Sequence, residues 1–388
     1  MTTVDAVLAQ TNALTESGRP DEAAAILRPL LAGGTGPIPL WAALAKALRH
    51  LGRPREALPI QEMLVQTAPS NMGFRFDLSE TLLLLGDFER GWREYHWRYS
   101  MAHTTAIARK VQRPRWDGRP APGRTLLIHD EQGFGDSLQF MRMAAWARQR
   151  SQARVVLEMN PNLLSLAARA GGFDQLIARG TVPPPFDIHC ETMSLPMVMG
   201  LRILDLPGTI PYLTPDPERL RRWESRLAGL SRPLVALAWA GRPQLYNGQN
   251  RAVSLATLAP LAMEGVTFLA VQKGPQAAEA NAPPAGMNLL SLSDEIADFE
   301  DTAAILSIAD LLISIDSAPA HLAGALGRPA WVMLGYVADW RWLLDRDDSP
   351  WYPTLRLFRQ EARGDWTGVV RRLAAALEQL ALAEFRDK

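Results

Sequence analysis

Residues 311–326 read LLISIDSAPAHLAGAL, and this stretch decides the fold. The run Leu311–Ile315 predicts a buried strand, because short apolar runs bounded by polar or turn residues are typical of parallel sheets. Ser317 can cap a helix through its hydroxyl, and Pro319 fits a first helical turn, because the backbone N–H that proline lacks would have no partner within the helix there. The stretch therefore predicts a strand, a tight loop and a helix from Ala320 to Leu326.

The same alternation of apolar runs and helical patterns extends in both directions. In the second half it gives the strands Leu234–Trp239, Val266–Val271 and Ala330–Leu334 and the helices Leu255–Met263 and Thr302–Ala309. An earlier series gives the strands Thr125–His129 and Val155–Glu158 and the helices Ser137–Arg150 and Leu163–Ala170. Strands that alternate with helices form parallel sheets, so we predict an α/β fold with two Rossmann-like domains, at residues 125–215 and 216–365. A last amphipathic helix within residues 366–388 is expected to close the structure.

The first hundred residues show a period of 34, carried by Leu14, Leu48 and Leu82 and by Gly18, Gly52 and Gly86. This is the length of a tetratricopeptide repeat, whose paired helices bury their apolar faces on neighbouring repeats. We predict an all-α domain of such repeats at residues 1–105, with an unrelated helical bundle as the alternative. The aromatic stretch Phe88–Tyr99 is expected to pack against the domain that follows.

A basic, proline-rich stretch at residues 106–124 predicts a linker between the repeats and the α/β domains. Its prolines interrupt regular structure. Its arginines fit a solvated connector better than a phosphate site, because arginine is common throughout this sequence.

Composition excludes several classes of protein. The 388 residues include 41 Lys and Arg and 41 Asp and Glu, so the balanced charge does not favour binding to nucleic acid or to an anionic membrane. The sequence shows no apolar run long enough for a transmembrane segment and no secretory signal at its start. The single cysteine, Cys190, excludes an intrachain disulfide and a multi-cysteine zinc site and is expected to be a buried thiol. We therefore expect a cytoplasmic protein.

Two loops stand where ligands bind parallel sheets, at the carboxyl ends of strands, where helix N-termini offer amide donors to an anion. The first loop, residues 129–136, reads HDEQGFGD and ends in Asp136 at the expected start of a helix. Asp136 either points toward a ligand or only caps the helix. A dinucleotide-binding fingerprint is the weaker alternative, since Leu138 occupies the place of its third glycine.

The second loop runs from Asp316 to His321. Backbone amides at the helix start suit a diphosphate, and His321 can donate to a phosphate oxygen. Asp316 can bind ribose or the amides of the loop. A purely structural His321 is the alternative.

Three parts of the sequence carry a resemblance to a known family: the pair Gly135-Asp136, the run DSAPAHLAGAL at residues 316–326 with Pro329, and the aromatic tail from Asp339 to Pro353. They resemble the heptosyltransferase-type glycosyltransferases of family 9, which have the two-domain GT-B fold. Together with the repeats, they are similar to bacterial tetratricopeptide-repeat glycosyltransferases. The resemblance implies transfer, with inversion, from a nucleotide-diphosphate sugar held by the second Rossmann-like domain to a hydroxyl acceptor held by the first.

The resemblance also implies roles for single residues. Asp136 matches the candidate base that takes the proton of the acceptor hydroxyl, and Glu131 in the same turn is the reserve candidate. In the donor site, the matching residues are Asp316, Ser317, His321, Arg251, Gln272 and Lys273. Arg251 stands where the family has a lysine, and its different shape leaves the donor sugar open.

We expect neither a metal ion nor a cofactor besides the nucleotide sugar, because GT-B enzymes hold the diphosphate with protein groups. The acidic stretch at residues 345–348 is read as a polar loop. The repeats suggest a protein acceptor, such as a surface or flagellar subunit, while a glycan or lipid precursor remains open. A non-catalytic scaffold or sugar-nucleotide sensor is the rival hypothesis.

Overall fold

The computed structural model describes residues 3–100, 111–206, 208–241 and 251–386. The chain divides into two compact units. A helical unit contains Met1–Lys110, Met199–Asp205 and Val337–Asp345, and an α/β unit contains Val111–Val198, Leu206–Tyr336 and Arg346–Lys388. Among the described residues, every helix is too short or too polar to cross a membrane.

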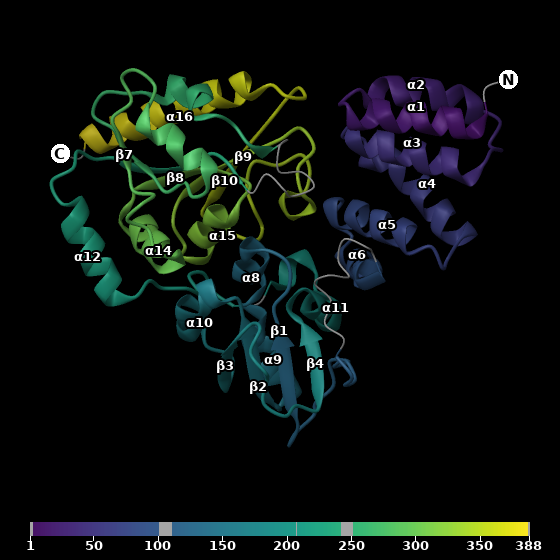
Figure 1. The fold of residues 1–388 in the computed structure, drawn as a ribbon, viewed down its shortest axis with the longest axis horizontal. Helices are drawn as coiled ribbons and strands as arrows, with labels where there is room; N and C mark the ends of the chain where they lie inside the picture. The colour runs from purple at the N-terminus through teal and green to yellow at the C-terminus, as the bar shows by residue number, and fades with distance from the viewer. Residues whose placement is uncertain (1–2, 101–110, 207, 242–250, 387–388) are drawn as a thin grey trace. The chain divides into compact units, whose positions relative to one another are not determined.

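The helical unit begins with a series of helices, each of which contacts the next in the chain (Figure 1): α1 (Val4–Glu16), α2 (Pro20–Leu31), α3 (Ile38–His50), α4 (Pro54–Thr67), α5 (Met72–Leu84) and α6 (Phe88–Tyr95). The glycines at the 34-residue spacing adopt φ values of 81°, 69° and 85°, which a residue with a Cβ rarely adopts. One backbone hydrogen bond recurs beside each of them: Arg19 N to Leu14 O, Arg53 N to Leu48 O, and Asp87 N to Leu82 O, at 2.8–2.9 Å. The sequence period is thus repeated in the backbone. That these units are tetratricopeptide repeats stays a prediction.

Side chains in this unit follow the same spacing. Arg28 forms an ion pair with Glu56 at 2.6 Å, and Arg90 forms one with Glu62. Residues 28 and 62 are equivalent in the repeat, as are 56 and 90, so the second pair is the first with its charges exchanged. Both pairs link successive helical hairpins.

The aromatic stretch Phe88–Tyr99 was expected to pack against the domain that follows, but the contacts of Trp92 and Tyr95 described here lie within the helical unit. The rings of Trp92 and Tyr95 lie 5.1 and 6.2 Å from that of Trp340, which belongs to the segment Val337–Asp345.

The first sheet of the α/β unit has the order β3-β2-β1-β4, with all pairs parallel. Its strands are β1 (Thr125–His129), β2 (Arg154–Met159), β3 (Gln175–Ala178) and β4 (Ile188–Glu191). The helices associated with it are α8 (Phe134–Phe140), α9 (Met143–Ser151), α10 (Leu164–Ala170) and α11 (Leu195–Met199).

The second sheet has the order β10-β9-β8-β5-β6-β7, again with all pairs parallel. Its strands are β5 (Leu234–Ala238), β6 (Thr267–Ala270), β7 (Leu289–Ser291), β8 (Leu311–Ile315), β9 (Ala330–Leu334) and β10 (Leu355–Arg359). The α-helices associated with it in the described part of the chain are α12 (Pro217–Leu227), α14 (Phe299–Ile308), α15 (Ala318–Ala325) and α16 (Trp366–Arg386). Apolar residues of α16 share one buried core with β5, β6 and β8, while α14 and α15 lie on the other side of the sheet in Figure 1. The prediction of two parallel-sheet α/β domains is therefore confirmed.

Several predicted helices differ from those observed. The helix expected at Ser137–Arg150 begins earlier, at Phe134, and is divided by a turn at Met141 and Arg142 into α8 and α9. The helix expected at Leu255–Met263 is a 3₁₀ helix, Leu255–Leu261, because Pro260 cannot supply the amide that a longer α-helix needs. The helix expected to close the chain is observed as α16.

The described part of the expected linker contacts the first sheet. Arg115 forms an isolated parallel β-bridge with His189 of β4, and the Trp116 amide donates to the His189 carbonyl at 2.7 Å. The Arg115 guanidinium contacts Glu191 at 2.8 Å. Burial alone would raise the pKa of Glu191, but Arg115 and His129 lower it to about 2. Residues 106–110 of the expected linker lie outside the described part of the chain.

Candidate functional site

The turn at residues 133–136 connects β1 to α8. Gly133 occupies the N-cap position, and Asp136 lies in the first helical turn with its Oδ2 accepting from the Gly133 amide at 2.9 Å. Asp136 is therefore not the N-cap residue; it closes the turn from within the helix, in the position where an acidic residue completes a capping box. Its side chain is half-buried. This hydrogen bond fixes the carboxylate of the candidate base at the start of α8.

Glu131, the reserve candidate, is placed differently. It is buried, and its Oε1 accepts from the Met193 amide at 3.2 Å. This bond ties the turn after β1 to the segment after β4. Of the two carboxylates, Asp136 is the more exposed.

Asp130 supports this turn, although sequence reasoning did not single it out. Its buried carboxylate accepts from the Ser137 hydroxyl at 3.1 Å and from the Asn160 amide at 2.8 Å. Arg179 lies 3.1 Å from its other oxygen. An acidic residue directly after a buried strand was the available signal for this bracing role.

In the second loop, Ser317 occupies the N-cap position of α15, but its hydroxyl does not bond a helix amide. Instead, its Oγ lies 3.0 Å from the Oγ of Ser314. Arg251 and Asp316 form an ion pair at 3.1 Å directly before this helix start. The structure thus brings together a guanidinium, a carboxylate and the amides of a helix N-terminus.

His321 lies at the contact between the two loops. It is buried, and its Nδ1 lies 3.2 Å from the Tyr352 hydroxyl. A Cβ placed on Gly135 would lie only 2.8 Å from the Cδ2 atom of His321, so this position requires glycine or a shift of the ring. The turn that carries Asp136 and helix α15, which follows the second loop, therefore meet at His321.

Gln272 and Lys273 are occupied with the backbone. Gln272 is buried, accepts from the amides of Trp239 and Ala240 at 2.9 Å each, and donates to the carbonyls of Ala240 and Lys273 at 2.9 and 2.7 Å. Lys273 donates to the carbonyls of Ser293 and Ile296 at 2.7 and 2.9 Å. These bonds hold the loops at the ends of β5 and β6, and a direct contact of either residue with a nucleotide stays a prediction.

A clasp formed by Arg142 and Tyr212 is a further feature that the sequence did not reveal. Arg142 donates to the carbonyls of Trp351 and Gly208 at 3.2 Å each and lies over the Tyr212 ring. The Tyr212 hydroxyl donates to the Leu138 carbonyl at 2.9 Å. Although the ring keeps some exposed surface, burial of the hydroxyl raises the pKa of Tyr212 to about 12. The clasp links α8 and the turn before α9 to the segment around Gly208 and Tyr212 and to Trp351.

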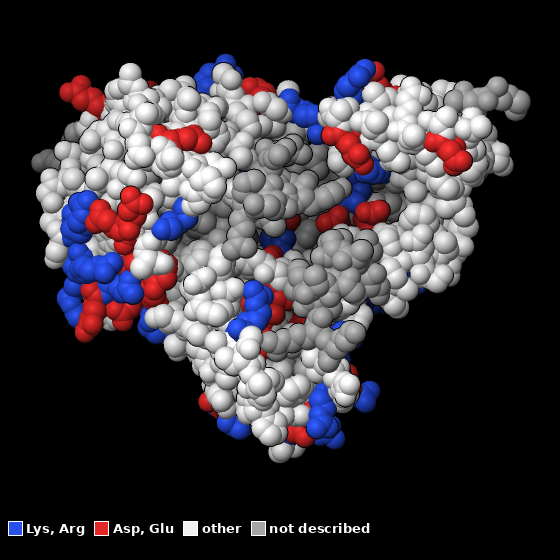
Figure 2. Space-filling model, in the orientation of Figure 1, with Lys and Arg blue, Asp and Glu red and all other residues white. Residues whose placement is uncertain are grey.

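A charged region lies over α12, where basic and acidic atoms are mixed at the left of Figure 2. Arg219 and Arg222 contact the buried Asp301 at 2.7 and 2.6 Å, and Arg226 contacts Glu295 at 2.8 Å. These arginines are paired with carboxylates, so this region is a structural ion-pair network rather than a binding surface for polyanions.

Comparisons with known proteins agree with this architecture. No protein-family model matches the chain. Protein FlbA of Caulobacter vibrioides is 25% identical over 438 residues, which cover 95% of this chain and 72% of FlbA. A glycosyl transferase family 9 structure from Veillonella parvula superposes with a TM-score of 0.50 and 10% identity, covering 69% of this chain and 100% of that chain. The ADP-heptose heptosyltransferase II of E. coli gives a TM-score of 0.48 with 14% identity, covering 67% of this chain and 99% of its own. The two parallel-sheet domains of this chain thus have the GT-B type of fold found in family 9 glycosyltransferases.

Proposed function

We propose that the chain is a glycosyltransferase that moves a sugar from a nucleotide-diphosphate donor to a hydroxyl acceptor, with inversion. The observation that carries this proposal is the contact between Gly135 and His321. Through it, the turn with a candidate base meets the helix start with a candidate diphosphate site. Such an arrangement suits transfer between two substrates that are held by different domains.

The donor diphosphate would bind at the N-terminus of α15. Helix amides and the helix dipole favour an anion there, and the Arg251 guanidinium lies beside them through its ion pair with Asp316. These protein groups would stabilise the leaving diphosphate without a metal ion. Asp136 would accept the proton of the attacking hydroxyl, since a carboxylate in its ionised form is a general base.

The acceptor is proposed to be a protein that is recognised by the helical repeats, with a glycan or lipid precursor as the other source of the hydroxyl group. We place this activity in the cytoplasm, where nucleotide sugars are available. We expect the protein not to bind nucleic acid.

Titration with nucleosides and with nucleoside mono- and diphosphates tests the donor site. We expect one diphosphate to bind more tightly than its nucleoside. Arg251→Ala should weaken this diphosphate roughly ten- to a hundred-fold, because one charge-assisted bond is lost and Asp316 is left facing the phosphates. Arg154 is an exposed arginine at the start of β2, so Arg154→Ala is the matched control and should bind the diphosphate as the wild type does. Equal affinity for diphosphate and nucleoside would refute the proposed donor site.

The rival function is a sugar-nucleotide sensor without catalysis. A sensor would bind the nucleotide sugar and leave it intact. Slow hydrolysis of the bound donor in the absence of acceptor would exclude this rival.

A further inference from the structure

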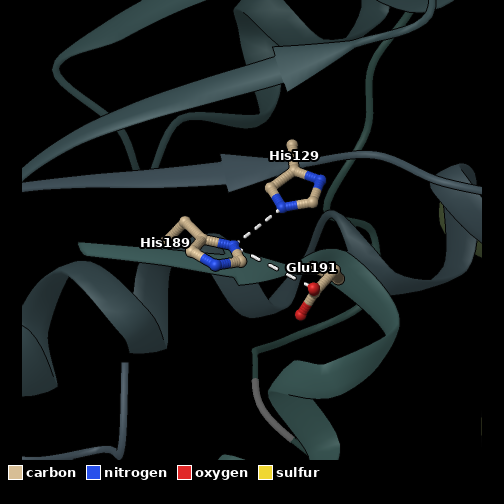
Figure 3. A group of neighbouring side chains, drawn as sticks. All are labelled: His129, His189 and Glu191. Atoms are coloured by element: carbon tan, nitrogen blue, oxygen red, sulfur yellow. Dashed lines mark hydrogen bonds and ion pairs between the residues drawn. The ribbon is translucent and has the colours of Figure 1, made fainter. Parts of the chain in front are cut away.

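A buried cluster of His129, His189 and Glu191 lies in the first sheet, outside the donor groups described above. One ligand atom from each residue lies within 4.8 Å of the other two. Figure 3 shows the three side chains pointing toward one another, His129 from β1 and the other two from β4. All three are buried, with exposed fractions of 3–4%.

Strand pairing explains why residues sixty positions apart meet. In the register of β1 and β4, His129 lies opposite Glu191, and His189 precedes Glu191 by two residues. Side chains two residues apart in a strand share one face of the sheet. Cys190 therefore points to the opposite face and is not part of the cluster.

The contact between the two imidazoles is the informative one. Nε2 of His129 lies 3.1 Å from Nδ1 of His189, and this Nδ1 lies 3.9 Å from Oε1 of Glu191. Two ring nitrogens that face each other at this distance must share a proton or be bridged by a cation, because their lone pairs repel. Ligands of one zinc ion lie about 3.4 Å apart, since each is ~2.1 Å from the metal in a tetrahedral arrangement.

The charges around the imidazoles also favour a cation. Glu191 faces them from β4, and Glu158 is the neighbour of His129 in the register of β2, where its side chain is fully buried. The second oxygen of Glu191, Oε2, is buried and has no hydrogen-bond partner among the residues that the structure describes. The Arg115 guanidinium contacts Oε1 of Glu191 but is 45% exposed, so it can turn toward solvent when an ion binds.

We propose that His129, His189 and Glu191 bind one divalent transition-metal ion, with zinc as the best fit to two imidazoles and a carboxylate. On binding, the ion takes the place of the proton between the two rings, and His129 stays neutral by carrying its proton on Nδ1 instead; a small rotation of Glu191 completes the protein ligands. Its role is to fix the carboxyl ends of β1 and β4. The turn with Glu131 and Asp136 starts at this point of β1, so the ion positions that turn and takes no part in holding a diphosphate.

Calorimetric titration of the metal-depleted full chain with Zn²⁺ tests the site. We expect one ion per chain and a higher melting temperature with zinc. His189→Gln should bind zinc at least about a hundred-fold more weakly. Cys190→Ser, which changes the neighbouring side chain on the opposite face, should bind within about three-fold of the wild type.

Zinc binding by His189→Gln that equals the wild type would overturn the proposal, as would a large loss in Cys190→Ser. Should His189→Gln not fold, the visible spectrum of Co²⁺ added to the wild type decides. Intense bands typical of a four-coordinate ion would support the site, and the weak spectrum of hydrated Co²⁺ would overturn it.

Discussion

Replacement of Asp136 by asparagine is expected to lower the rate of sugar transfer by at least about a hundred-fold and to leave the stability of the chain unchanged. The structural reason is the bond that Asp136 Oδ2 accepts from the Gly133 amide at 2.9 Å. The side-chain oxygen of asparagine can accept the same bond. The turn is therefore kept while the proton acceptor is lost.

Asp136→Ala provides the matched comparison, because it removes both the base and the bond to Gly133. Loss of such a helix-start bond costs about 0.5–2 kcal/mol of stability. Asp136→Ala should therefore lose activity and stability, whereas Asp136→Asn should lose only activity.

The assay is a single-turnover rate at saturating donor, with the donor affinity and the free energy of unfolding measured on the same samples. Unchanged donor affinity together with the lower rate would place the effect on the chemical step. A rate for Asp136→Asn within about three-fold of the wild type would refute the assignment. Glu131→Gln would then be the next variant, since Glu131 is the reserve candidate in this turn.

Three further predictions concern the packing and the ionised groups of the α/β unit. Gly135→Ala should cost about 1–3 kcal/mol and weaken transfer, because the new methyl group would lie 2.8 Å from His321. Gly241→Ala is the control in thermal unfolding, because among the described residues its methyl group would meet only Ile315, at 3.9 Å. Asp301→Asn should lose roughly 2–3 kcal/mol of stability at pH 7. Burial raises the pKa of Asp301, but Arg219 and Trp223 lower it more strongly, to below its ordinary value of 3.8. The wild type therefore loses this stability as the carboxylate is protonated, and denaturation at a series of pH values should show the difference between the two proteins shrinking below about pH 4. The pKa of Tyr212 is raised from 10.0 to about 12, so the unfolded chain releases this proton first and the wild type loses stability as the pH rises from 10 toward 12. Tyr212→Phe should lose less stability over this range in urea unfolding, and an equal loss in both proteins would contradict this.

The central strands could be predicted from the sequence because their apolar runs are short and bounded by turn residues. The bounds of Thr125–His129, Leu311–Ile315 and Ala330–Leu334 are confirmed residue by residue. The strands β3, β4, β7 and β10 were missed. They lie at or near the sheet edges, and their polar or charged residues, such as His189 and Glu191 in β4, obscure an apolar run.

The two loops proposed to carry the base and to bind the donor could be located from the sequence because each follows a predictable strand. The contacts between these loops could not be predicted, since they depend on how segments far apart in the sequence pack together in the fold. His321 was expected to face a ligand, but its partners Gly135 and Tyr352 come from distant segments. The pairing of β1 with β4 likewise follows from the order of strands in the sheet, so the cluster around His189 has no local sequence signal.

A crystal structure of the full chain with the nucleoside diphosphate that binds best would test the central claim most directly. The account predicts that the β-phosphate lies on the amides at the N-terminus of α15, within hydrogen-bond distance of Arg251, while Asp136 faces the end of the diphosphate where the sugar is attached. A diphosphate bound instead on the turn at Gly133 and Gly135, as a dinucleotide would bind, would contradict the proposed donor site and the transfer reaction built on it.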